Sequence, residues 1–367
     1  MNIRRISATF AGLAAVAWAS ANLAQELWIH PRCKELPFRQ VGPLARLGDG
    51  SLLVVESNAT RVSKDDGRTW SEPRKIYDGP APGIPSSGVL VRTGGGVLVL
   101  VYLDLSTYKW GWDETRREPI DDVRLDVWSI RSLDQGRTWV DRQKILDGYC
   151  GALIDIIQTS TGEIVVPVQD LLRNPGRHGM WVYVSEDEGK TWTRSNLIDL
   201  GGHGDHDGAM EPTLTELRDG RLWMLLRTNW DRFWQAYSED KGRSWRTIMP
   251  SQIDASSAPG YMLRLASGRL ALVWNRLYPE GKTSGPRHGG DRQRSSVPAS
   301  WHRQELSLAF SGDDGKTWTK PVVIARRAKG GLAYPYLFEA HPGELWVTTR
   351  FSSHIYLSLR EADFVQQ

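Results

Sequence analysis

The sequence contains only two cysteines, Cys33 and Cys150, among its 367 residues. Disulfide bonds therefore do not build this fold, because small domains that depend on them carry many more cysteines for their length. In an oxidising compartment the two thiols either form one bridge or stay unpaired, and the sequence leaves both open. No established metal-binding spacing such as HExxH is present, so we expect no metal site.

Long apolar runs and a strong net charge are also missing. Past its first residues the chain never approaches the roughly 18 uninterrupted apolar residues of a membrane helix, so we expect no membrane span. It carries 46 Lys and Arg against 43 Asp and Glu, a net charge of +3. Removal of Arg4 and Arg5 with a leader would leave about +1, which is too small to argue for nucleic acid as a partner. We expect a monomer.

The first residues have the pattern of an export signal. Two arginines precede a mostly apolar stretch, Ile6–Val16, and residues 19–21 (ASA) fit a cleavage site with small residues at its first and third positions. We interpret residues 1–21 as a signal peptide of a secreted or periplasmic protein, with one domain over residues 22–367. An ordinary N-terminal helix is the alternative.

Five copies of one short motif, S-x-D-x-G-[RK]-[TS]-W, run along the chain at irregular intervals. In each copy the Asp carboxylate and the Thr or Ser hydroxyl can hydrogen-bond nearby backbone groups, and Gly supplies a positive φ. The Trp is expected to fold back over the apolar base of a hairpin turn. Near-identical copies indicate a repeat architecture. The copies are Ser63–Trp70 (SKDDGRTW), Ser132–Trp139 (SLDQGRTW), Ser185–Trp192 (SEDEGKTW), Ser238–Trp245 (SEDKGRSW) and Ser311–Trp318 (SGDDGKTW).

A glycine turn followed by an apolar run precedes each copy, and a sixth such turn has no motif after it. Apolar alternation around each glycine predicts a hairpin between two strands, and the motif then joins a third strand to a fourth. Six such units predict an all-β fold, a six-bladed β-propeller, with a seven-bladed ring as the alternative. We expect Glu26–His30 to supply the outer strand of blade six. The glycines are Gly50, Gly96, Gly162, Gly220, Gly268 and Gly343.

The phase of the strands decides which residues can meet. In a four-stranded antiparallel blade, the turns between strands 1 and 2 and the motif turns lie on one face of the ring. The motif aspartates are therefore structural and are not catalytic acids. An active site belongs on the opposite face, around the central axis, where loops are free to carry chemistry. The motif aspartates are Asp65, Asp134, Asp187, Asp240 and Asp313.

That opposite face collects polar residues from four blades. Arg39 precedes the first strand of blade one. Glu211 opens the first strand of blade four, and Arg227 ends its second strand. Arg303 begins the third strand of blade five, and Tyr334 begins the first strand of blade six. We expect these five side chains to converge at one end of the axis.

With these motifs the chain resembles the sialidase superfamily over residues 36–360, the repeated motif being the Asp-box of that family. The resemblance implies that Arg39, Arg227 and Arg303 bind the substrate carboxylate. It also implies that Tyr334 attacks the anomeric carbon and that Glu211 activates it, with no cofactor.

The chemistry explains why these residue types suit such a substrate. A sialic acid glycoside carries its carboxylate on the anomeric carbon, where a carboxylate nucleophile would meet like charge. A neutral phenol that loses its proton to a glutamate during attack avoids that repulsion. Planar guanidinium groups bind a carboxylate bidentately and stay charged.

The acid that protonates the leaving group is missing from its expected place. Members of the family take this Asp from a loop of blade one, but Glu56–Ser63 (ESNATRVS) contains none. Asp104 is our first choice as a substitute, because it ends the second strand of blade two and leads into a long insertion, Ser106–Asp122. Glu56 and Asp170 occupy equivalent positions in blades one and three.

Two further segments lie on the predicted active face. The run 202–207 (GHGDHD) is interpreted as a loop, as a substrate contact or acid/base group, or as a metal site, in the absence of any recognised metal spacing. The Gly-, Ser- and Arg-rich segment Tyr278–Trp301 is expected to be a flap over the site with contacts to the aglycone.

The sequence thus predicts an exo-α-sialidase-like glycoside hydrolase that removes a terminal acidic sugar with retention of configuration. Its expected partners are sialylated or other acidic glycans. Two alternatives stay open: a hydrolase of another ulosonic or uronic acid, and a non-catalytic propeller that binds glycan or protein through the same face. The missing acid favours the second alternative.

Overall fold

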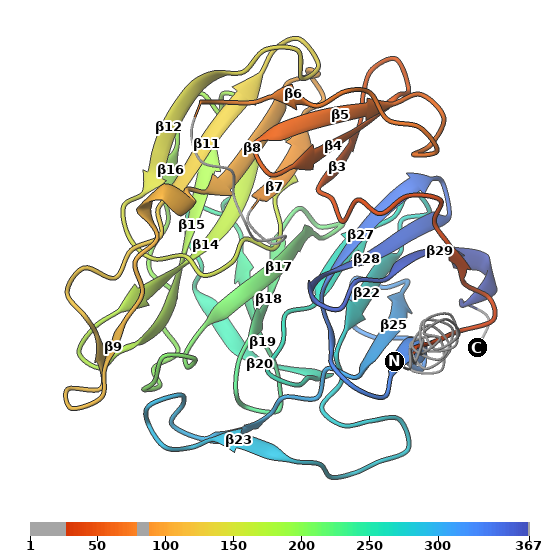
Figure 1. Cartoon of the computed structure of the whole chain (residues 1–367). Helices are drawn as coiled ribbons and strands as arrows, with labels where there is room; N and C mark the ends of the chain where they lie inside the picture. Colours follow the sequence, from red (N-terminus) through yellow and green to blue (C-terminus); the bar gives the residue numbers. More distant parts are fainter. Residues whose placement is uncertain (1–26, 79–87, 366–367) are drawn as a thin grey trace, which may run out of the picture.

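The computed structural model describes residues 27–78 and 88–365. Figure 1 shows antiparallel sheets arranged in a ring, with very little helix. Six of these sheets contain the four strands of a blade, so the predicted six-bladed all-β propeller is confirmed. The predicted signal peptide, residues 1–21, and Glu26 lie outside the described residues.

The first three blades follow one another along the chain, each as an antiparallel four-stranded sheet. Blade one consists of β3 (Leu44–Arg46), β4 (Leu52–Glu56), β5 (Ala59–Ser63) and β6 (Arg74–Lys75). Blade two consists of β7 (Gly88–Arg92), β8 (Leu98–Leu103), β11 (Val127–Ser132) and β12 (Val140–Leu146). Blade three consists of β13 (Ile157–Gln158), β14 (Ile164–Leu172), β15 (Arg177–Ser185) and β16 (Thr193–Arg194).

The last three blades include the strands that complete the ring. Blade four consists of β17 (Met210–Glu216), β18 (Leu222–Arg227), β19 (Arg232–Ser238) and β20 (Thr247–Asp254). Blade five consists of β21 (Tyr261–Arg264), β22 (Leu270–Trp274), β25 (Glu305–Ser311), β26 (Val322–Arg327) and β1 (Leu27–Ile29). Blade six consists of β27 (Leu332–His341), β28 (Glu344–Ser352), β29 (Tyr356–Arg360) and β2 (Lys34–Glu35).

Two small hairpins and two short 3₁₀ helices stand outside the blades. The insertion of blade two contains η1 (Leu105–Thr107), β9 (Trp112–Asp113) and β10 (Glu118–Pro119). The segment between the second and third strands of blade five contains β23 (Arg287–Gly289) and β24 (Pro298–Ser300). η2 (Glu361–Asp363) follows β29.

The N-terminal strand closes the ring differently from our expectation. Residues 27–29 form β1, which pairs with β26 as a fifth strand of blade five. The outer strand of blade six is instead β2, which pairs with β29. The prediction that Glu26–His30 lies beside blade six is therefore wrong. The apolar pattern of this segment predicts a strand, but a three-residue edge strand contains no information about which of two neighbouring edges it joins.

The glycine turns occur where the sequence predicts them. All six glycines adopt positive φ, from 76° at Gly343 to 106° at Gly162. A Cβ would strain this backbone, which explains why glycine recurs at the turn between the first two strands of every blade.

The Asp-box turns have one hydrogen-bond pattern, for which blade three is representative. The hydroxyl of Ser185 lies 2.8 Å from Oδ1 of Asp187 and accepts from the N–H of Gly189. Thr191 donates its N–H to Oδ1 and its hydroxyl to Oδ2 of Asp187, at 2.8 and 2.6 Å. The tryptophans differ between boxes: the indole of Trp192 donates to Ser129 of the preceding blade at 3.0 Å, whereas those of Trp245 and Trp318 donate to glycine carbonyls of their own boxes. The box aspartate thus closes the turn, as predicted.

The same turns also join neighbouring blades. In blades two and three the residue after the box aspartate contacts the turn between strands 1 and 2 of the blade before it. Gln135 accepts a hydrogen bond from the N–H of Gly48 at 3.1 Å, and Glu188 accepts one from the hydroxyl of Thr93 at 2.6 Å. These boxes therefore connect two blades as well as two strands.

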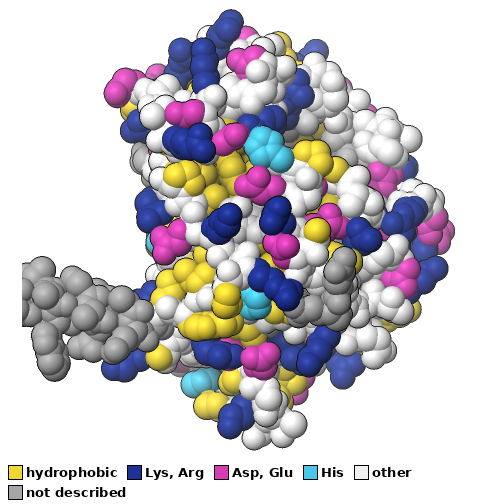
Figure 2. Space-filling model, turned by 90° about the vertical axis from the view of Figure 1, so that its right-hand side faces the viewer, with side chains coloured by type: hydrophobic (Ala, Val, Ile, Leu, Met, Phe, Trp, Pro, Cys, Tyr) yellow, Lys and Arg dark blue, Asp and Glu magenta, His cyan; other side chains and the backbone are white. Residues whose placement is uncertain are grey.

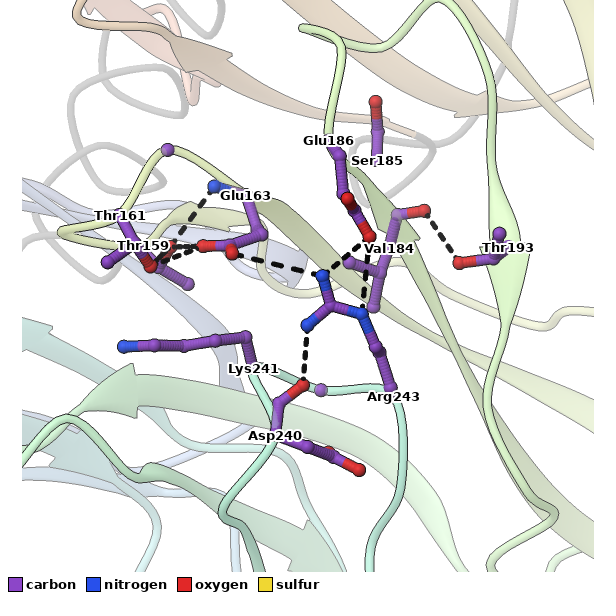
Figure 3. A network of polar contacts seen from close by, with 12 residues as sticks. Thr159, Thr161, Glu163, Val184, Ser185, Glu186, Thr193, Asp240, Lys241 and Arg243 are labelled. Carbon is purple, nitrogen blue, oxygen red and sulfur yellow. Dashed lines mark hydrogen bonds and ion pairs between the residues drawn. The ribbon is translucent and has the colours of Figure 1, made fainter.

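Between blades three and four an arginine makes this connection (Figure 3). Arg243, in the box of blade four, donates to the carboxylate of Glu186 in the box of blade three. It also donates to the backbone carbonyl of Asp240 at 2.8 Å and lies 3.9 Å from the carboxylate of Glu163 in the blade-three turn. Exposed ion pairs of this kind contribute little one by one, so their effect is chiefly to fix the register of the blades.

The box aspartates make the stability of the fold depend on acid. Hydrogen bonds from Thr69 and Ser63 lower the pKa of Asp65 to about 2, and those from Thr317 lower the pKa of Asp313 to about 2. Because these pKa values are lowered in the folded protein, the carboxylates stabilise the fold when the pH is above the ordinary pKa of 3.8. This contribution disappears as the pH falls toward 2.

We expect the thermal unfolding midpoint to fall between pH 4 and pH 2. The double variant Asp65→Asn/Asp313→Asn has no carboxyls to titrate at these two boxes, so its midpoint should change less over that interval. Calorimetric scans at stepped pH measure both slopes. Equal slopes for the two proteins would contradict the structural role of these carboxylates.

Buried apolar side chains fill the spaces between neighbouring blades. Leu53 and Val55 of blade one pack with Leu98 and Leu100 of blade two, and similar clusters follow around the ring. Each blade thus buries its faces against two neighbours in the described part of the chain.

The two cysteines lie in different clusters. Cys33 packs among side chains of blades five, six and one, and Cys150 among those of blades two and three. Both thiols are free and buried, and burial raises the pKa of Cys33 to about 12. The bridge that the sequence leaves open is therefore not formed.

Charges of both signs are interspersed on the face that Figure 2 shows. This agrees with the small net charge of +3. Within residues 27–78 and 88–365, no helix has the length and hydrophobicity needed to cross a membrane.

Candidate active site

Four of the five residues predicted to converge do meet at the inner strand ends. The phenol of Tyr334, on β27, donates to Oε1 of Glu211, on β17, at 2.6 Å. Arg227, at the end of β18, donates to Oε2 of the same carboxylate at 2.6 Å and lies 3.4 Å from the Tyr334 hydroxyl. Both Glu211 and Arg227 are buried. The tyrosine and the arginine, which come from two different strands, thus both bind the carboxylate of Glu211 on a third strand.

Arg303 lies near the tyrosine ring, next to two further aromatic side chains. Its guanidinium carbon is 5.8 Å from the ring centre of Tyr334 and 5.6 Å from that of Trp301. The backbone carbonyl of Ser257 accepts from its Nη2 at 2.8 Å, while the Ser257 hydroxyl accepts from Nε and Nη2 of Arg227. Ser257 therefore spaces the two guanidinium groups, and Nε of Arg303 is buried without a partner among the described residues.

The backbone is strained at both ends of the Tyr–Glu hydrogen bond. Glu211 has φ of 41° and Tyr334 has φ of 57°, a left-handed conformation that costs on the order of 1–3 kcal/mol for a residue with a side chain. The register of β17 against β18 also shifts between Met210 and Thr213, which is a bulge. Bulges of this kind re-aim a side chain near functional sites. Here the irregular backbone turns Glu211 toward Tyr334.

The electrostatics of the cluster place its proton on the tyrosine. Burial alone would raise the pKa of Glu211, but the charge of Arg227 and the hydrogen bonds from Tyr334 and Arg227 outweigh it and hold that pKa below its ordinary value. Burial and the charge of Glu211 raise the pKa of Tyr334, against the opposite effect of Arg227 and Arg303. The resting site therefore contains a neutral phenol bonded to a carboxylate.

Arg39 is not part of this cluster, and its expected place beside Arg227 and Arg303 is wrong. Its guanidinium donates to the carbonyls of Leu36 and Phe38 and lies 5.2 Å from the ring of Tyr356, with 61% of the side chain exposed. The chain here follows the outer edge of blade six after β2, so residue 39 comes too early to reach the axis. Nearer the axis is Gly42, where a Cβ would lie 2.7 Å from the Tyr336 ring.

Asp104 also has another role. Its carboxylate caps η1, accepting from the N–H and hydroxyl of Ser106 at 3.1 and 2.6 Å, and lies 3.3 Å from Arg142. This engagement does not support Asp104 as the acid. The two alternatives are engaged as well: Glu56 pairs with Arg61, and Asp170 accepts from two backbone N–H groups.

Aromatic side chains that the sequence analysis did not select surround Tyr334. The ring of Phe351, 49% exposed, lies 5.1 Å from that of Tyr334, and Trp301 stacks on Arg303. Trp301 stands two residues before Arg303, at the end of the predicted flap. This position in the sequence could have identified it as a site residue. Nothing local marks Phe351, because only the pairing of β27 with β28 brings it beside Tyr334.

A third buried arginine, Arg350 on β28, also escaped the sequence analysis. Its guanidinium carbon lies 4.3 Å from the ring centre of Tyr336, and its Nε and Nη2 are buried without partners among the described residues. Burial lowers the pKa of Arg350. This guanidinium packs on Tyr336 and makes none of the hydrogen bonds that join Arg227, Glu211 and Tyr334.

The two long loops meet on this face. The indole of Trp112, in the blade-two insertion, donates to the side chain of Gln293 in the segment 278–301 at 2.9 Å. The N–H groups of Asp205 and His206 donate to the carbonyls of Gln293 and Arg294. In Figure 1 the hairpin that carries β23 lies below the ring, next to the loop that carries β9. Among the described residues, no group of His, Cys, Asp and Glu is arranged to hold a metal ion.

Comparison with known proteins finds a protein family and a curated relative with significant similarity. The profile of the BNR repeat-like domain matches residues 59–347. A sialidase of Clostridium perfringens is 27% identical over 216 residues, which are 52% of this chain and 53% of that protein. The chain thus spans about half the length of this relative.

Solved structures share the fold at low identity. A Hadza microbial sialidase superposes with a TM-score of 0.59 at 16% identity, over 89% of this chain and 66% of the other. A protein of unknown function from Dyadobacter fermentans gives 0.58 at 15% identity, over 91% and 98%. The intramolecular trans-sialidase from Ruminococcus gnavus gives 0.55 at 14% identity, over 90% and 96%.

Proposed function

The chain belongs to the BNR repeat-like family of the sialidase superfamily, and on this premise we propose that it is a retaining exo-glycosidase for a terminal acidic sugar, most directly α-linked sialic acid. The observation that carries the proposal is the cluster of Tyr334, Glu211, Arg227 and Arg303 at the inner ends of the strands. A phenol, a base and two fixed guanidinium groups are the groups this reaction needs.

In the proposed reaction the substrate carboxylate binds between Arg227 and Arg303. The Tyr334 oxygen forms a bond to the anomeric carbon while the aglycone oxygen leaves with the electron pair of the glycosidic bond and takes a proton from an acid, and the phenolic proton passes to Glu211. Water then attacks the anomeric carbon and gives one proton back to that acid, the tyrosine leaves and recovers its proton from Glu211, and the free sugar has its original configuration. Tyrosine as nucleophile is a known exception to the two-carboxylate scheme of glycosidases.

The substrate itself makes Glu211 a better base. In the unliganded site Arg227 holds the pKa of Glu211 low, which opposes proton transfer from Tyr334. A substrate carboxylate beside Arg227 shares that positive charge and adds a negative one. Both effects raise the pKa of Glu211, so the base becomes competent when an acidic sugar is bound. Neutral sugars lack this effect and are poor substrates on this proposal.

The test is a panel of terminal glycosides assayed with the full chain. We expect cleavage of α-linked sialosides and no cleavage of neutral hexosides, with NMR showing that the first product is the α-anomer. Cleavage confined to another ulosonic or uronic acid would favour the first alternative. Binding of sialic acid without cleavage of any substrate would favour a glycan-binding propeller, the reading that the engaged carboxylate of Asp104 supports.

Arg303 allows a sharper test of carboxylate binding. Charge-assisted hydrogen bonds contribute roughly 1.5–3 kcal/mol, so Arg303→Met should raise KM for a sialoside by about 10- to 150-fold. The fold should be little affected, because within residues 27–78 and 88–365 this guanidinium makes one hydrogen bond, to Ser257. Arg39→Met is the matched control and should leave KM unchanged. A KM effect of Arg39→Met equal to that of Arg303→Met would contradict the assignment.

The signal peptide is also part of the proposal, because acidic glycans are displayed outside cells. Expression of the full chain with its leader should place active protein in the periplasm or medium, starting after residue 21. N-terminal sequencing of the exported protein measures this.

A further inference from the structure

A histidine and its neighbouring carboxylate stand at the rim of the Tyr–Glu–Arg cluster. Nδ1 of His206 lies 3.0 Å from Oδ1 of Asp205, with 42% of the histidine side chain and 21% of the aspartate side chain exposed. Neither of these two atoms has a hydrogen-bond partner elsewhere in the described residues. Two lone pairs this close repel each other, so a proton must lie on Nδ1. That leaves Nε2 as the nitrogen that exchanges protons.

The backbone around this histidine is held from three sides. The N–H of His206 donates to the carbonyl of Arg294 in the segment 278–301 at 2.8 Å, and its carbonyl accepts from Asn229 of blade four at 2.6 Å. The carbonyl of Asp205 accepts from Nε2 of His178, on β15, at 2.9 Å. Such contacts place the imidazole before substrate arrives, which is a requirement for proton transfer in a transition state.

Contacts through Trp301 connect His206 with the cluster. The ring of Trp301 lies 6.0 Å from that of His206 and 5.6 Å from the guanidinium carbon of Arg303, which in turn is 5.8 Å from the Tyr334 ring. The charges of His206, Glu211 and Arg227 all affect the pKa of the buried His178, so all three lie near it. Trp301 therefore stands between His206 and the arginine that is expected to hold the sugar, and 42% of the His206 side chain is exposed.

We propose that His206, oriented by Asp205, is the acid/base residue of this site and replaces the aspartate that is absent from blade one. This inference rests on the proposed function, since it assigns the one role there that no engaged carboxylate fills.

In the first step Nε2 of the His206 imidazolium gives its proton to the aglycone oxygen as that oxygen takes the electron pair of the breaking glycosidic bond. The imidazole that remains keeps its Nδ1 proton toward Asp205. In the second step Nε2 takes a proton from the water that bonds to the anomeric carbon. The histidine ends each cycle as imidazolium, so the protons balance.

His178 is the other histidine near the cluster, and it does not fit this role. It is buried, and burial, with the charge of His206 next, lowers its pKa to about 4. It therefore stays neutral at ordinary pH and has no second proton to give. Its hydrogen bond to the carbonyl of Asp205 makes it a positioning residue for the loop.

The test compares two leaving groups in wild type and variants of the full chain. A nitrophenyl sialoside has a leaving group that needs no protonation, whereas sialyllactose has one that does. His206→Asn should keep activity on the nitrophenyl substrate within about 10-fold and lose about 10²–10⁴-fold on sialyllactose. Added azide attacks without a base, so this variant should form sialyl azide.

His203→Asn is the matched control, because His203 lies in the same loop and its ring contacts the carbonyl of Arg117. It should show the same loss, if any, on both substrates and no azide product. An equal loss on both substrates with His206→Asn, without azide product, would overturn the assignment of His206 alone. No cleavage of either substrate by the wild type would overturn the proposed function and this inference together.

Discussion

Replacing Tyr334 by Phe should reduce turnover of a sialoside by at least about 10³-fold, because the variant keeps the ring and loses only the nucleophilic oxygen. The lost hydrogen bond to Glu211 should lower the free energy of unfolding by roughly 0.5–1.5 kcal/mol, and the carboxylate keeps its ion pair with Arg227. Ligand binding should persist, since the guanidinium groups are unchanged. Single-turnover kinetics and calorimetric titration with a sialic acid analogue measure the two effects separately.

The same strand supplies a matched control. Tyr336 is buried two residues further along β27, and its hydroxyl accepts from the N–H of Leu44 at 2.9 Å. Tyr336→Phe should therefore lower stability by a similar amount and leave turnover nearly unchanged. A Tyr334→Phe enzyme as active as the wild type would remove the tyrosine from the mechanism and favour a binding propeller.

Replacing Arg227 by Met should have the largest effect on stability. The change leaves Glu211 buried without its cation, and breaking a buried pair in this way costs about 3–5 kcal/mol. Without the arginine, burial dominates and the pKa of Glu211 rises above its ordinary value. Protonation removes the buried, unpaired charge of this carboxyl. The loss in free energy of unfolding of the variant should therefore shrink as the pH falls from 7 toward 5. Urea unfolding at both pH values measures this.

Two further variants isolate the cause of that loss. Arg227→Met/Glu211→Gln removes the uncompensated charge and should regain part of the stability that the single variant loses. Arg276→Met breaks the partly exposed pair with Asp254 and should change stability by at most about 1 kcal/mol. Equal losses in Arg227→Met and Arg276→Met would show that burial of the Glu211–Arg227 pair has no energetic consequence.

Repetition explains how much of the fold the sequence predicts. Each blade has its own glycine turn, and five of the blades also have an Asp-box. Most blades are therefore marked by two separate motifs, and the number of blades does not depend on one motif alone. The site residues Glu211, Arg227, Arg303 and Tyr334 are predictable for a related reason: each stands at the end of a strand whose phase the turn fixes. Strand ends near the axis have little choice of direction.

The wrong expectations fall where no repeat unit constrains the chain. Arg39 lies in the path between β2 and β3, and only tertiary packing decides how far that path runs along blade six before it turns inward. Asp104 stands at a strand end, but Ser106 two residues later offers its carboxylate a local cap that competes with any longer-range role. His206 belongs to a loop whose place depends on a contact with the segment 278–301, almost ninety residues away in sequence.

The pairing of β1 and β2 orders the events of biosynthesis. These strands leave the ribosome first, yet their partners β26 and β29 are among the last to be made. Until β26 and then β29 have emerged, β1 and β2 have no partner strands, so the nascent chain exposes unpaired backbone that aggregates readily. Pairing of β1 and β2 thus marks the completion of the chain, because only a nearly complete chain contains both partner strands.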